Sequence, residues 1–261
     1  METINNAKDV KNQYATSGNL NTRISIHDKY STNKQGFSNF IVSNYKIEEG
    51  MKVLELGCGT GSMWKGHEDL IKKCLKIVLS DFSEGMVDTI RDNIGEADNI
   101  EYKAIDIQNI PYEDDTFDIV IANMMLYHVP DRNKGLSEVK RVLKNGGLFY
   151  SATYGEHGII EYLSKVLGKY GVEDTVDKSF TLQNGGETLS KFFGEVTKVN
   201  YEDSLAVTNL DDIVDYIYSL SNMTSLESIP RDEIKDALAK HMKDGILNVP
   251  KEYGLFISVS I

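Results

Sequence analysis

The chain has 261 residues, of which 41% are hydrophobic and 26% are charged, values typical of a globular protein that buries a full core. The formal net charge of −12 argues against binding to nucleic acid, because counterion release at phosphates requires a basic surface. We therefore expect a small-molecule substrate or a protein partner.

The chain also shows no sign of export. The opening residues METINNAKDVKNQY lack the apolar stretch of a signal peptide, and no window approaches the length and apolarity of a membrane span. Cys58 and Cys74 form no CxxC pair and do not indicate a disulfide framework. We expect a cytoplasmic protein that does not interact with membranes. The acidic charge is expected to keep it in solution as a monomer or weak homodimer.

The first two thirds of the chain alternate between apolar runs and helical patterns. The gaps between the runs are long enough for crossover helices, and helical spacing of apolar residues recurs at 83–94 and 131–143. The second of these helices is expected to stop at a turn, Asn145-Gly146-Gly147. The pattern predicts an α/β protein with a doubly wound parallel sheet. Its expected strands are 51–56, 76–80, 100–104, 117–122 and 147–153.

After residue 154 helical patterns dominate. They cover 156–169, 186–193 and 209–243, and strand-like runs follow at 195–201 and 255–261. Two late strands would complete a seven-stranded sheet. We expect one domain over 1–261, because no linker-like segment interrupts it. Its expected parts are an N-terminal helical lid segment at 1–45, a cofactor-binding core at 46–154, and late strands with helical cap insertions at 155–261.

A glycine-rich loop follows the first expected strand. The apolar run reaches the acid Glu55, and then Gly57, Gly59 and Gly61 take three of the next six positions. On an open parallel sheet, ligands bind beyond the carboxyl ends of the strands, and glycines let the backbone pass beneath them. A nucleotide-like ligand is the first hypothesis. The spacing G-x-G-x-G departs from the G-x-G-x-x-G of dinucleotide sites, which disfavours a nicotinamide-dependent oxidoreductase but leaves it as an alternative.

Two further acids follow the second and third expected strands. Asp81 stands 20 residues beyond Gly61, where a carboxylate can accept hydrogen bonds from both ribose hydroxyls. Asp106 could accept from the exocyclic amine of an adenine, with Phe82, Met86 and Ile107 enclosing the ring. A single acid after a strand is more often a turn or a helix cap. The ordered set, together with the glycine loop, favours a cofactor site.

These motifs as a set resemble the class I S-adenosylmethionine-dependent methyltransferases, in the small-molecule group that includes the quinone-biosynthesis-like enzymes. ELGCGTG at 55–61 matches the first motif of that family, FDIVIANMMLYHVPD at 117–131 resembles its fourth-strand motif, and KRVLKNGGLFYSAT at 140–153 resembles the approach to its fifth strand. The resemblance implies a Rossmann-like sheet of order 3-2-1-4-5-7-6 with an antiparallel last strand. It also implies S-adenosyl-L-methionine as the cofactor and S-adenosyl-L-homocysteine as the product.

The resemblance further implies a role for particular residues. The loop glycines border the methionine part of the cofactor. Glu55 and Cys58 belong to the same motif and are likewise expected to bind the cofactor. The acid after strand two, Asp81, holds the ribose, and Asp106 with Ile107 meets the adenine. The residue after strand four, Asn123, contacts the methionine part.

The expected reaction is an in-line displacement that needs alignment and exclusion of water more than catalytic side chains. His128, just after the fourth strand, is the candidate general base, or else it packs at the turn of Val129 and Pro130.

We expect methyl transfer to N, O or C of a small molecule; a binding protein without catalysis is a further alternative. ANMM, in place of an N/D-P-P-Y motif, sets nucleic-acid bases and glutamine amides aside as substrates, and no ligand cluster indicates a metal.

The stretch NLNTRISIHDKYSTN at 19–33 carries three further candidates. Arg23, His27 and Tyr30 share one face if the stretch is helical, and relatives place a segment over the cofactor here. Arg23 would pair with the cofactor carboxylate, while His27 and Tyr30 would face the acceptor. The alternative is an amphipathic helix with an exposed polar face. The only tryptophan, Trp64, either lines the cofactor pocket or pins the first helix to the sheet.

Overall fold

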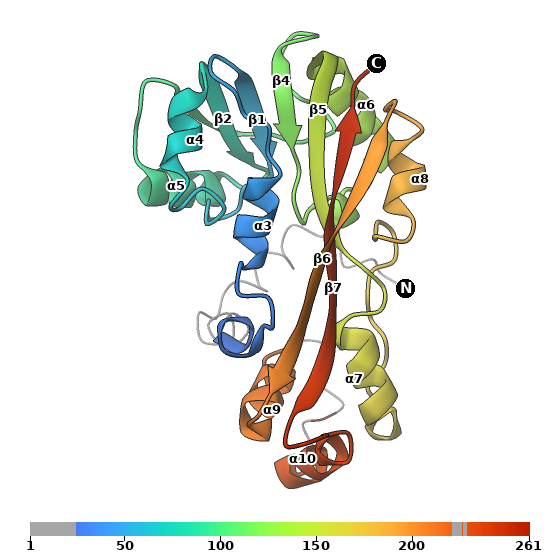
Figure 1. Cartoon of the computed structure of the whole chain (residues 1–261). Helices are drawn as coiled ribbons and strands as arrows, with labels where there is room; N and C mark the ends of the chain where they lie inside the picture. Colours follow the sequence, from blue (N-terminus) through green and yellow to red (C-terminus); the bar gives the residue numbers. More distant parts are fainter. Residues whose placement is uncertain (1–24, 221–225, 227–228) are drawn as a thin grey trace. The chain divides into compact units, whose positions relative to one another are not determined.

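The computed structural model describes residues 25–220, 226 and 229–261, and they form two compact units (Figure 1). The described residues of unit 1 lie within 25–36, Gly155–Asp177 and Glu202–Tyr253. Unit 2 comprises Phe37–Tyr154, Lys178–Tyr201 and Gly254–Ile261. The expected lid segment 1–45 is therefore shared between the units, with the boundary after Gly36. The expected single domain with lid, core and cap stays a prediction.

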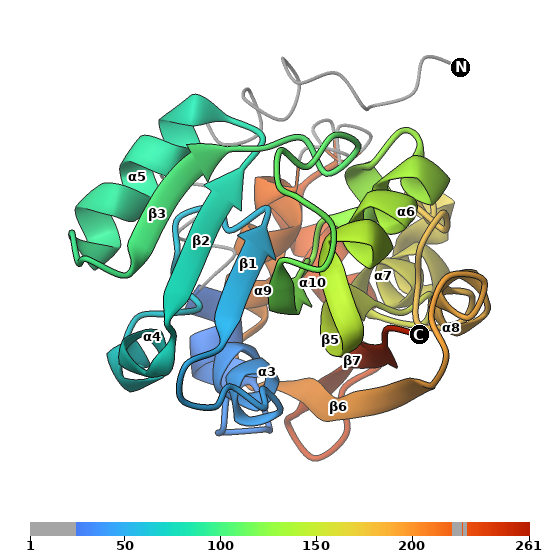
Figure 2. The same cartoon turned by 90° about the horizontal axis from the view of Figure 1, so that it is seen from above.

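The sheet has seven strands in the order β3-β2-β1-β4-β5-β7-β6 (Figure 2). Neighbouring strands from β3 to β5 pair in parallel. β7 runs antiparallel, since Gly146 N donates to Ser260 O and Ser260 N donates back to Gly147 O, both at 2.9 Å. The predicted fold class and strand order are confirmed. The strands are β1 (Lys52–Leu56), β2 (Lys76–Asp81), β3 (Ile100–Ala104), β4 (Phe117–Ile121), β5 (Leu143–Tyr154), β6 (Val196–Val207) and β7 (Leu247–Val259).

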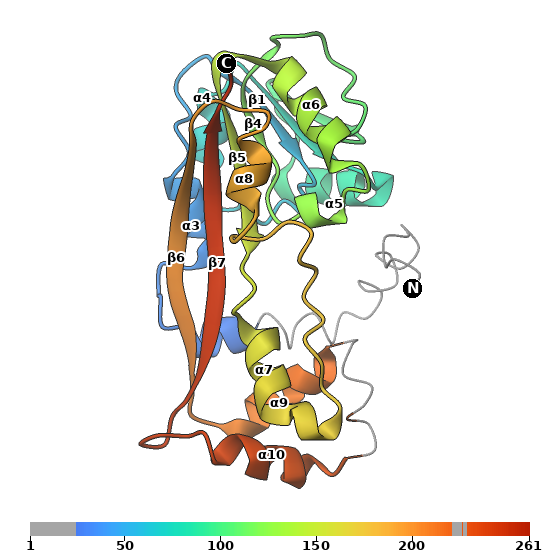
Figure 3. The ribbon, with the colours of Figure 1, turned by 90° about the vertical axis from the view of Figure 1, so that its right-hand side faces the viewer.

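In unit 2 both faces of the sheet are covered by helices (Figure 3). Val53, Ile77 and Ile121 point to the face that packs against α3, α4 and α5, whereas Leu54 and Val120 point to the face that packs against α6 and α8. The strands are buried on both sides, which explains their continuous apolar runs. The helices are α3 (Phe37–Ser43), α4 (Glu68–Lys73), α5 (Glu84–Ile94), α6 (Arg132–Val142) and α8 (Gly185–Leu189).

The helices predicted at 83–94 and 131–143 are confirmed as α5 and α6. Asp131 caps α6, because its Oδ1 accepts from Lys134 N at 3.0 Å. The turn predicted after this helix is wrong, because β5 already begins at Leu143, which pairs with Phe117. The residues between form an irregularity within the strand, and Gly146 takes a φ of 77° there.

Unit 1 has a hydrophobic core of its own, in which residues of helix 25–30 such as Tyr30 pack with Leu163, Leu205, Ile213 and Leu247. Its other helices are α7 (Ile159–Leu167), the 3-10 turn η2 (Gly168–Tyr170), α9 (Leu210–Ser219) and α10 (Arg231–Ala239). The long ends of β6 and β7 complete this core, so the cap is not purely helical.

The late strands are longer than predicted. Of the range 209–243 predicted as helical, α9 and α10 are confirmed, whereas residues 220, 229–230 and 240–243 are not helical. β6 extends to Val207 and β7 begins at Leu247. Pro250 and Gly254 lie inside β7, and both residue types indicate a break when the sequence is read locally. Across the described parts of the chain, no helix combines the length and apolarity that crossing a bilayer requires.

Candidate active site

The glycine loop lies at the carboxyl edge of β1, which pairs with β2 on one side and β4 on the other. Strand order reverses at this point, and ligands of open α/β sheets bind there. Gly57, Gly59 and Gly61 have φ angles of 71°, 55° and 73°, in the left-handed region that favours glycine. The loop is therefore shaped by its backbone rather than by side chains.

The three glycines do not face the same surroundings. A Cβ on Gly61 would lie 2.4 Å from Cγ1 of Ile90, and one on Gly57 would lie 3.0 Å from Cγ of Met125. These two positions are packed against α5 and the segment after β4. A Cβ on Gly59 would meet nothing within 4 Å. Gly59 therefore borders open space, as a loop beneath a ligand requires.

Asp81, the last residue of β2, is tied to this loop. Its Oδ2 accepts from Gly59 N and its Oδ1 from Ser83 N, each at 3.0 Å. A carboxylate has about four lone-pair sites, so two internal bonds leave acceptor capacity for hydroxyl groups. The ring of Phe82 beside it is 65% exposed, and Met86 is half-buried on α5. The structure thus ties Asp81 to the loop, with Phe82 next to it in the chain and Met86 on α5.

Asp106 and Ile107, both predicted to contact the adenine, lie in different surroundings. Asp106 is half-buried, and its Oδ1 accepts from Gln108 N at 2.8 Å and from Gln108 Nε2 at 3.1 Å. Ile107 points the other way: it is buried in the core below α6, against Gly135. Asp106 thus keeps an oriented carboxylate, whereas the side chain of Ile107 belongs to the core.

Beneath the loop lies a buried polar group, Glu55. Its Oε2 accepts from Trp64 Nε1 at 2.5 Å, and the whole residue is 3% exposed. Burial raises the pKa of Glu55 to about 7, with a further increase from the charge of Asp81, while the Trp64 hydrogen bond acts in the opposite direction. Trp64 is itself fully buried, so it packs below the loop and lines no open pocket.

Asn123 lies two residues beyond β4, and its side chain is held on both sides. Its Oδ1 accepts from Ala152 N at 3.1 Å, and its Nδ2 donates to Tyr45 Oη at 2.6 Å. Its predicted contact with the methionine part of a cofactor stays a prediction. Sequence reasoning missed Tyr45, because the bond joins positions 78 residues apart and no local pattern indicates it.

His128 ends the 3-10 turn η1 (Leu126–His128) after β4, with an exposed side chain. Its ring centroid lies 4.4 Å from that of Tyr127, and Tyr127 lies 4.6 Å from Tyr154 at the end of β5. These rings form an aromatic row at the carboxyl edge of the sheet. The following helix is capped by Asp131 rather than by His128. A role as general base stays a prediction.

His27 and Tyr30 lie in unit 1, on helix 25–30. Tyr30 is buried and its hydroxyl donates to Asp212 at the start of α9. The His27 ring contacts Tyr216 edge-on, with centroids 6.1 Å apart. Burial, aided by the charge of Lys251, lowers the pKa of His27 to about 4, so it is neutral at pH 7. Both side chains pack into unit 1. The expectation that they face the methyl acceptor stays a prediction. Arg23 lies outside the described residues.

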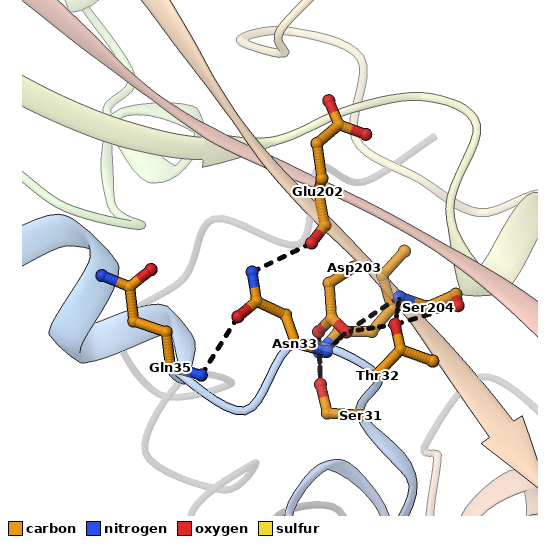
Figure 4. Close-up of polar contacts among 8 residues, drawn as sticks. Ser31, Thr32, Asn33, Gln35, Glu202, Asp203 and Ser204 are labelled. Carbon is orange, nitrogen blue, oxygen red and sulfur yellow. Dashed lines mark hydrogen bonds and ion pairs between the residues drawn. The ribbon is translucent and has the colours of Figure 1, made fainter.

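The chain after helix 25–30 is anchored to β6 through Asp203 (Figure 4). The Asp203 carboxylate accepts from the hydroxyls of Ser31 and Thr32 and from Asn33 N, and it pairs with the buried ammonium of Lys251. Burial opposes its ionisation, but the bonds from Lys251, Ser31 and Asn33 outweigh burial and lower the pKa to about 2. No motif in the sequence indicated this anchor.

The described residues hold no group of three or more His, Cys, Asp or Glu side chains arranged to bind a metal. Both cysteines are unpaired, and burial raises the pKa of the Cys58 thiol far above its usual range. An open pocket of about 460 Å³ involves Arg141, Leu143 and Ser260, at the opposite edge of the sheet from the glycine loop.

With this geometry in hand, comparison with known proteins gives a family match: residues 54–151 fit the model described as "Methyltransferase domain". This segment is similar to the methyltransferase domains of that family. Over 134 residues the chain is 34% identical to the ubiquinone/menaquinone biosynthesis C-methyltransferase UbiE of Escherichia coli O1:K1, an overlap of 50% of this chain and 53% of UbiE. The chain thus spans about half the length of the curated relatives it matches. The resemblance seen in the motifs is confirmed for this domain.

Solved structures share the methyltransferase fold. Phosphoethanolamine N-methyltransferase 2 of Haemonchus contortus, in complex with phosphomonomethylethanolamine and S-adenosylhomocysteine, aligns with a TM-score of 0.59 at 17% identity over 100% of this chain and 60% of that one. An S-adenosylmethionine-dependent methyltransferase of Aquifex aeolicus aligns with a TM-score of 0.52 at 15% identity, over 92% and 98% of the two chains. At these identities the likeness establishes the fold.

Proposed function

We propose that this chain is an S-adenosylmethionine-dependent methyltransferase that acts on a small molecule. The observation that carries the proposal is the loop Gly57–Gly61 at the strand-order reversal, with open space beside Gly59 and the acids Glu55 and Asp81 on either side. The match of residues 54–151 to the methyltransferase domain supports it.

The residues at the loop fit the chemistry of the cofactor. Asp81 is oriented by Gly59 and keeps lone pairs for the ribose hydroxyls. Asp106 offers a carboxylate to the adenine amine, and the exposed ring of Phe82 offers a stacking surface. Glu55, when ionised, would accept from the ammonium of the methionine part. The site is shaped, rather than charged, by Gly57, Gly61, Cys58, Met86 and Asn123. Arg23 remains an expected contributor, and Ile107 would contribute through its backbone, since its side chain lies in the core.

S-adenosylmethionine supplies a methyl group on a positively charged sulfur. The residues of the chain then need to align an acceptor with that carbon and exclude water, which can contribute several kcal/mol. His128 would take the proton from a phenol, alcohol or ammonium acceptor, since its side chain is exposed beside the aromatic row. His27 and Tyr30 remain predicted contacts of the acceptor.

The acceptor is a small molecule with an N, O or C nucleophile. UbiE is named a C-methyltransferase and the Haemonchus protein an N-methyltransferase, so relatives of this domain differ in the atom they methylate. The net charge of −12 supports an acceptor other than nucleic acid. We place the reaction in the cytoplasm, carried out by a monomer or weak homodimer.

The test is calorimetric titration with S-adenosylmethionine, S-adenosylhomocysteine and NAD. We expect micromolar binding of the first two, weakened at least about tenfold in Asp81→Ala, because one carboxylate accepting two ribose hydroxyls contributes more than about 1.4 kcal/mol. Asp88→Ala, an exposed acid on α5, is the matched control and should bind like the wild type. Tight binding of NAD alone would favour the oxidoreductase. Cofactor binding without methyl transfer to any acceptor would favour a non-catalytic protein.

A further inference from the structure

The bond between Trp64 and Glu55 joins two buried residues at the edge where the cofactor is expected. Glu55 is 3% exposed and Trp64 is fully buried. Oε2 of Glu55 accepts from the indole Nε1 at 2.5 Å, whereas Oε1 has no hydrogen-bond partner among the residues that the structure describes. One oxygen is thus held by the indole, and the other is available to a ligand.

Trp64 belongs to the glycine loop as well as to the core. Its backbone N donates to Gly61 O at 3.0 Å, so the loop geometry sets where the indole lies. Its ring lies 6.1 Å from that of Tyr45, which is hydrogen-bonded to Asn123. The indole therefore links the loop to residues at the ends of β1 and β4.

The electrostatic surroundings of Glu55 oppose its ionisation. Burial is the largest effect, and the charge of Asp81 adds to it; together they raise the pKa to about 7. The other titratable groups facing it, Tyr45 and Cys58, have raised pKa values, mainly through burial, and the charge of Glu55 contributes to both. Among the described residues, Trp64 is the group that favours the carboxylate by donating to it.

We propose that Trp64 is a positioning residue of the cofactor site: its indole N–H orients the Glu55 carboxylate, so that the second oxygen of Glu55 can accept from the ammonium of S-adenosylmethionine. The inference rests on the proposed function. It gives the indole a role that phenylalanine could not fill, since phenylalanine occupies much of the same space without a donor.

The test removes the indole N–H and keeps an aromatic side chain at position 64. Trp64→Phe and replacement of Trp64 by 3-benzothienylalanine, an isostere without the donor, are titrated without ligand by carbon-13 NMR of the Glu55 carboxyl. We expect the midpoint of the Glu55 titration to rise by about one pH unit, because the ionised carboxylate loses the hydrogen bond that favours it and solvation replaces that bond only in part. An unchanged midpoint in the folded isostere variant overturns the proposal.

Cofactor affinity over pH 6–9 separates positioning from packing. In the variants the affinity should fall about three- to tenfold at pH 7 and return to the wild-type value near pH 9, where Glu55 is ionised regardless. In a Glu55→Gln background the carboxylate is absent. Removal of the indole N–H should then not make the cofactor affinity depend on pH over this range. Tyr150→Phe is the matched control, since its hydroxyl accepts from Lys46 N and the residue lies in the same apolar cluster.

The possible failures are distinguishable. If the wild type binds S-adenosylmethionine and the variants lose affinity equally at every pH, Trp64 acts by packing alone and the positioning role is wrong. If the wild type binds no S-adenosylmethionine at any pH, the proposed function fails, and with it this inference, even where the Glu55 midpoint moves.

Discussion

The two units of the chain are stabilised by different means. Unit 2 buries apolar side chains on both faces of its sheet, and Glu55 is the exceptional charged group inside it. Unit 1 has one apolar cluster and, beside it, the buried ion pair of Asp203 and Lys251 that also holds the chain at 31–33. Elements of unit 2 follow from local patterns, whereas unit 1 depends on contacts between distant positions.

Removal of the ion pair should show this dependence most strongly. Asp203→Ala leaves the ammonium of Lys251 buried without its carboxylate and frees the donors of Ser31 and Asn33. We expect a loss of roughly 3–5 kcal/mol in the free energy of unfolding of unit 1, the usual cost of breaking a buried pair. Hydrogen exchange at the β6 amides 203–207 measures it.

The control for that change is Asp215→Ala, which removes a surface pair with Arg231 in the same unit. Exposed pairs contribute about 0–1 kcal/mol, so exchange at 203–207 should stay near the wild-type rate. If the two variants lost equal stability, the buried pair would not be what distinguishes unit 1.

Unit 2 should be most sensitive where the glycine loop meets the core. Gly61→Ala places a Cβ 2.4 Å from Ile90 at a φ of 73°, so we expect a loss of about 2–4 kcal/mol from strain and overpacking. Gly59→Ala has only the φ penalty, because the space beside it is open, and should lose about 1–2 kcal/mol. Trp64 fluorescence during urea unfolding reports both, and equal losses would contradict the packed role of Gly61.

The units should also differ in their response to acid. His27 has a pKa lowered to about 4 in the folded state, so only the unfolded chain takes up its proton as the pH falls below 6.5. The contribution of neutral, buried His27 to the stability of unit 1 is therefore complete above pH 6.5 and falls at lower pH. We expect the free energy of unfolding to decrease by about 2 kcal/mol between pH 7.5 and 5. His27→Gln should remove this part of the pH dependence. An unchanged pH profile in that variant would show that His27 is not buried in its neutral form.

The smallest expected effect lies at a helix start in unit 2. Asp131→Ala removes the side chain that accepts from Lys134 N at the start of α6, and such caps contribute about 1 kcal/mol. Asp131→Asn keeps the acceptor and should lie within a few tenths of a kcal/mol of the wild type. Thermal unfolding of both variants tests whether local capping, predictable from sequence, stabilises unit 2 to this extent.

The pattern of the chain predicted most of unit 2. Continuous apolar runs and helical spacing between them placed five strands and α5 and α6, because each signal is local. The same reasoning shortened β6 and β7, since Pro250 and Gly254 indicate breaks that the surrounding sheet overrides. The anchor at Asp203 lies 172 positions from Ser31, and no local pattern joins them.

The candidate site shows the same division. The glycine spacing and the acids Glu55 and Asp81 could be recognised in the sequence, because the types and the order of these residues indicate a cofactor site. The partners of Glu55 and Asn123 could not be predicted, because the Trp64 bond to Glu55 and the Tyr45 bond to Asn123 depend on how the chain packs. Ile107 was expected beside the adenine, yet the structure buries it below α6, because its apolar side chain suits either place.

The central claim, that the glycine loop of unit 2 holds the cofactor, is tested most directly by NMR titration of the labelled protein with S-adenosylhomocysteine. The account predicts saturable shifts of the backbone amides of Gly57, Gly59 and Gly61, together with those of Phe82 and Gln108. Shifts confined to the pocket at the opposite edge of the sheet, near Asn145 and Ser260, or no shifts at all, would contradict it.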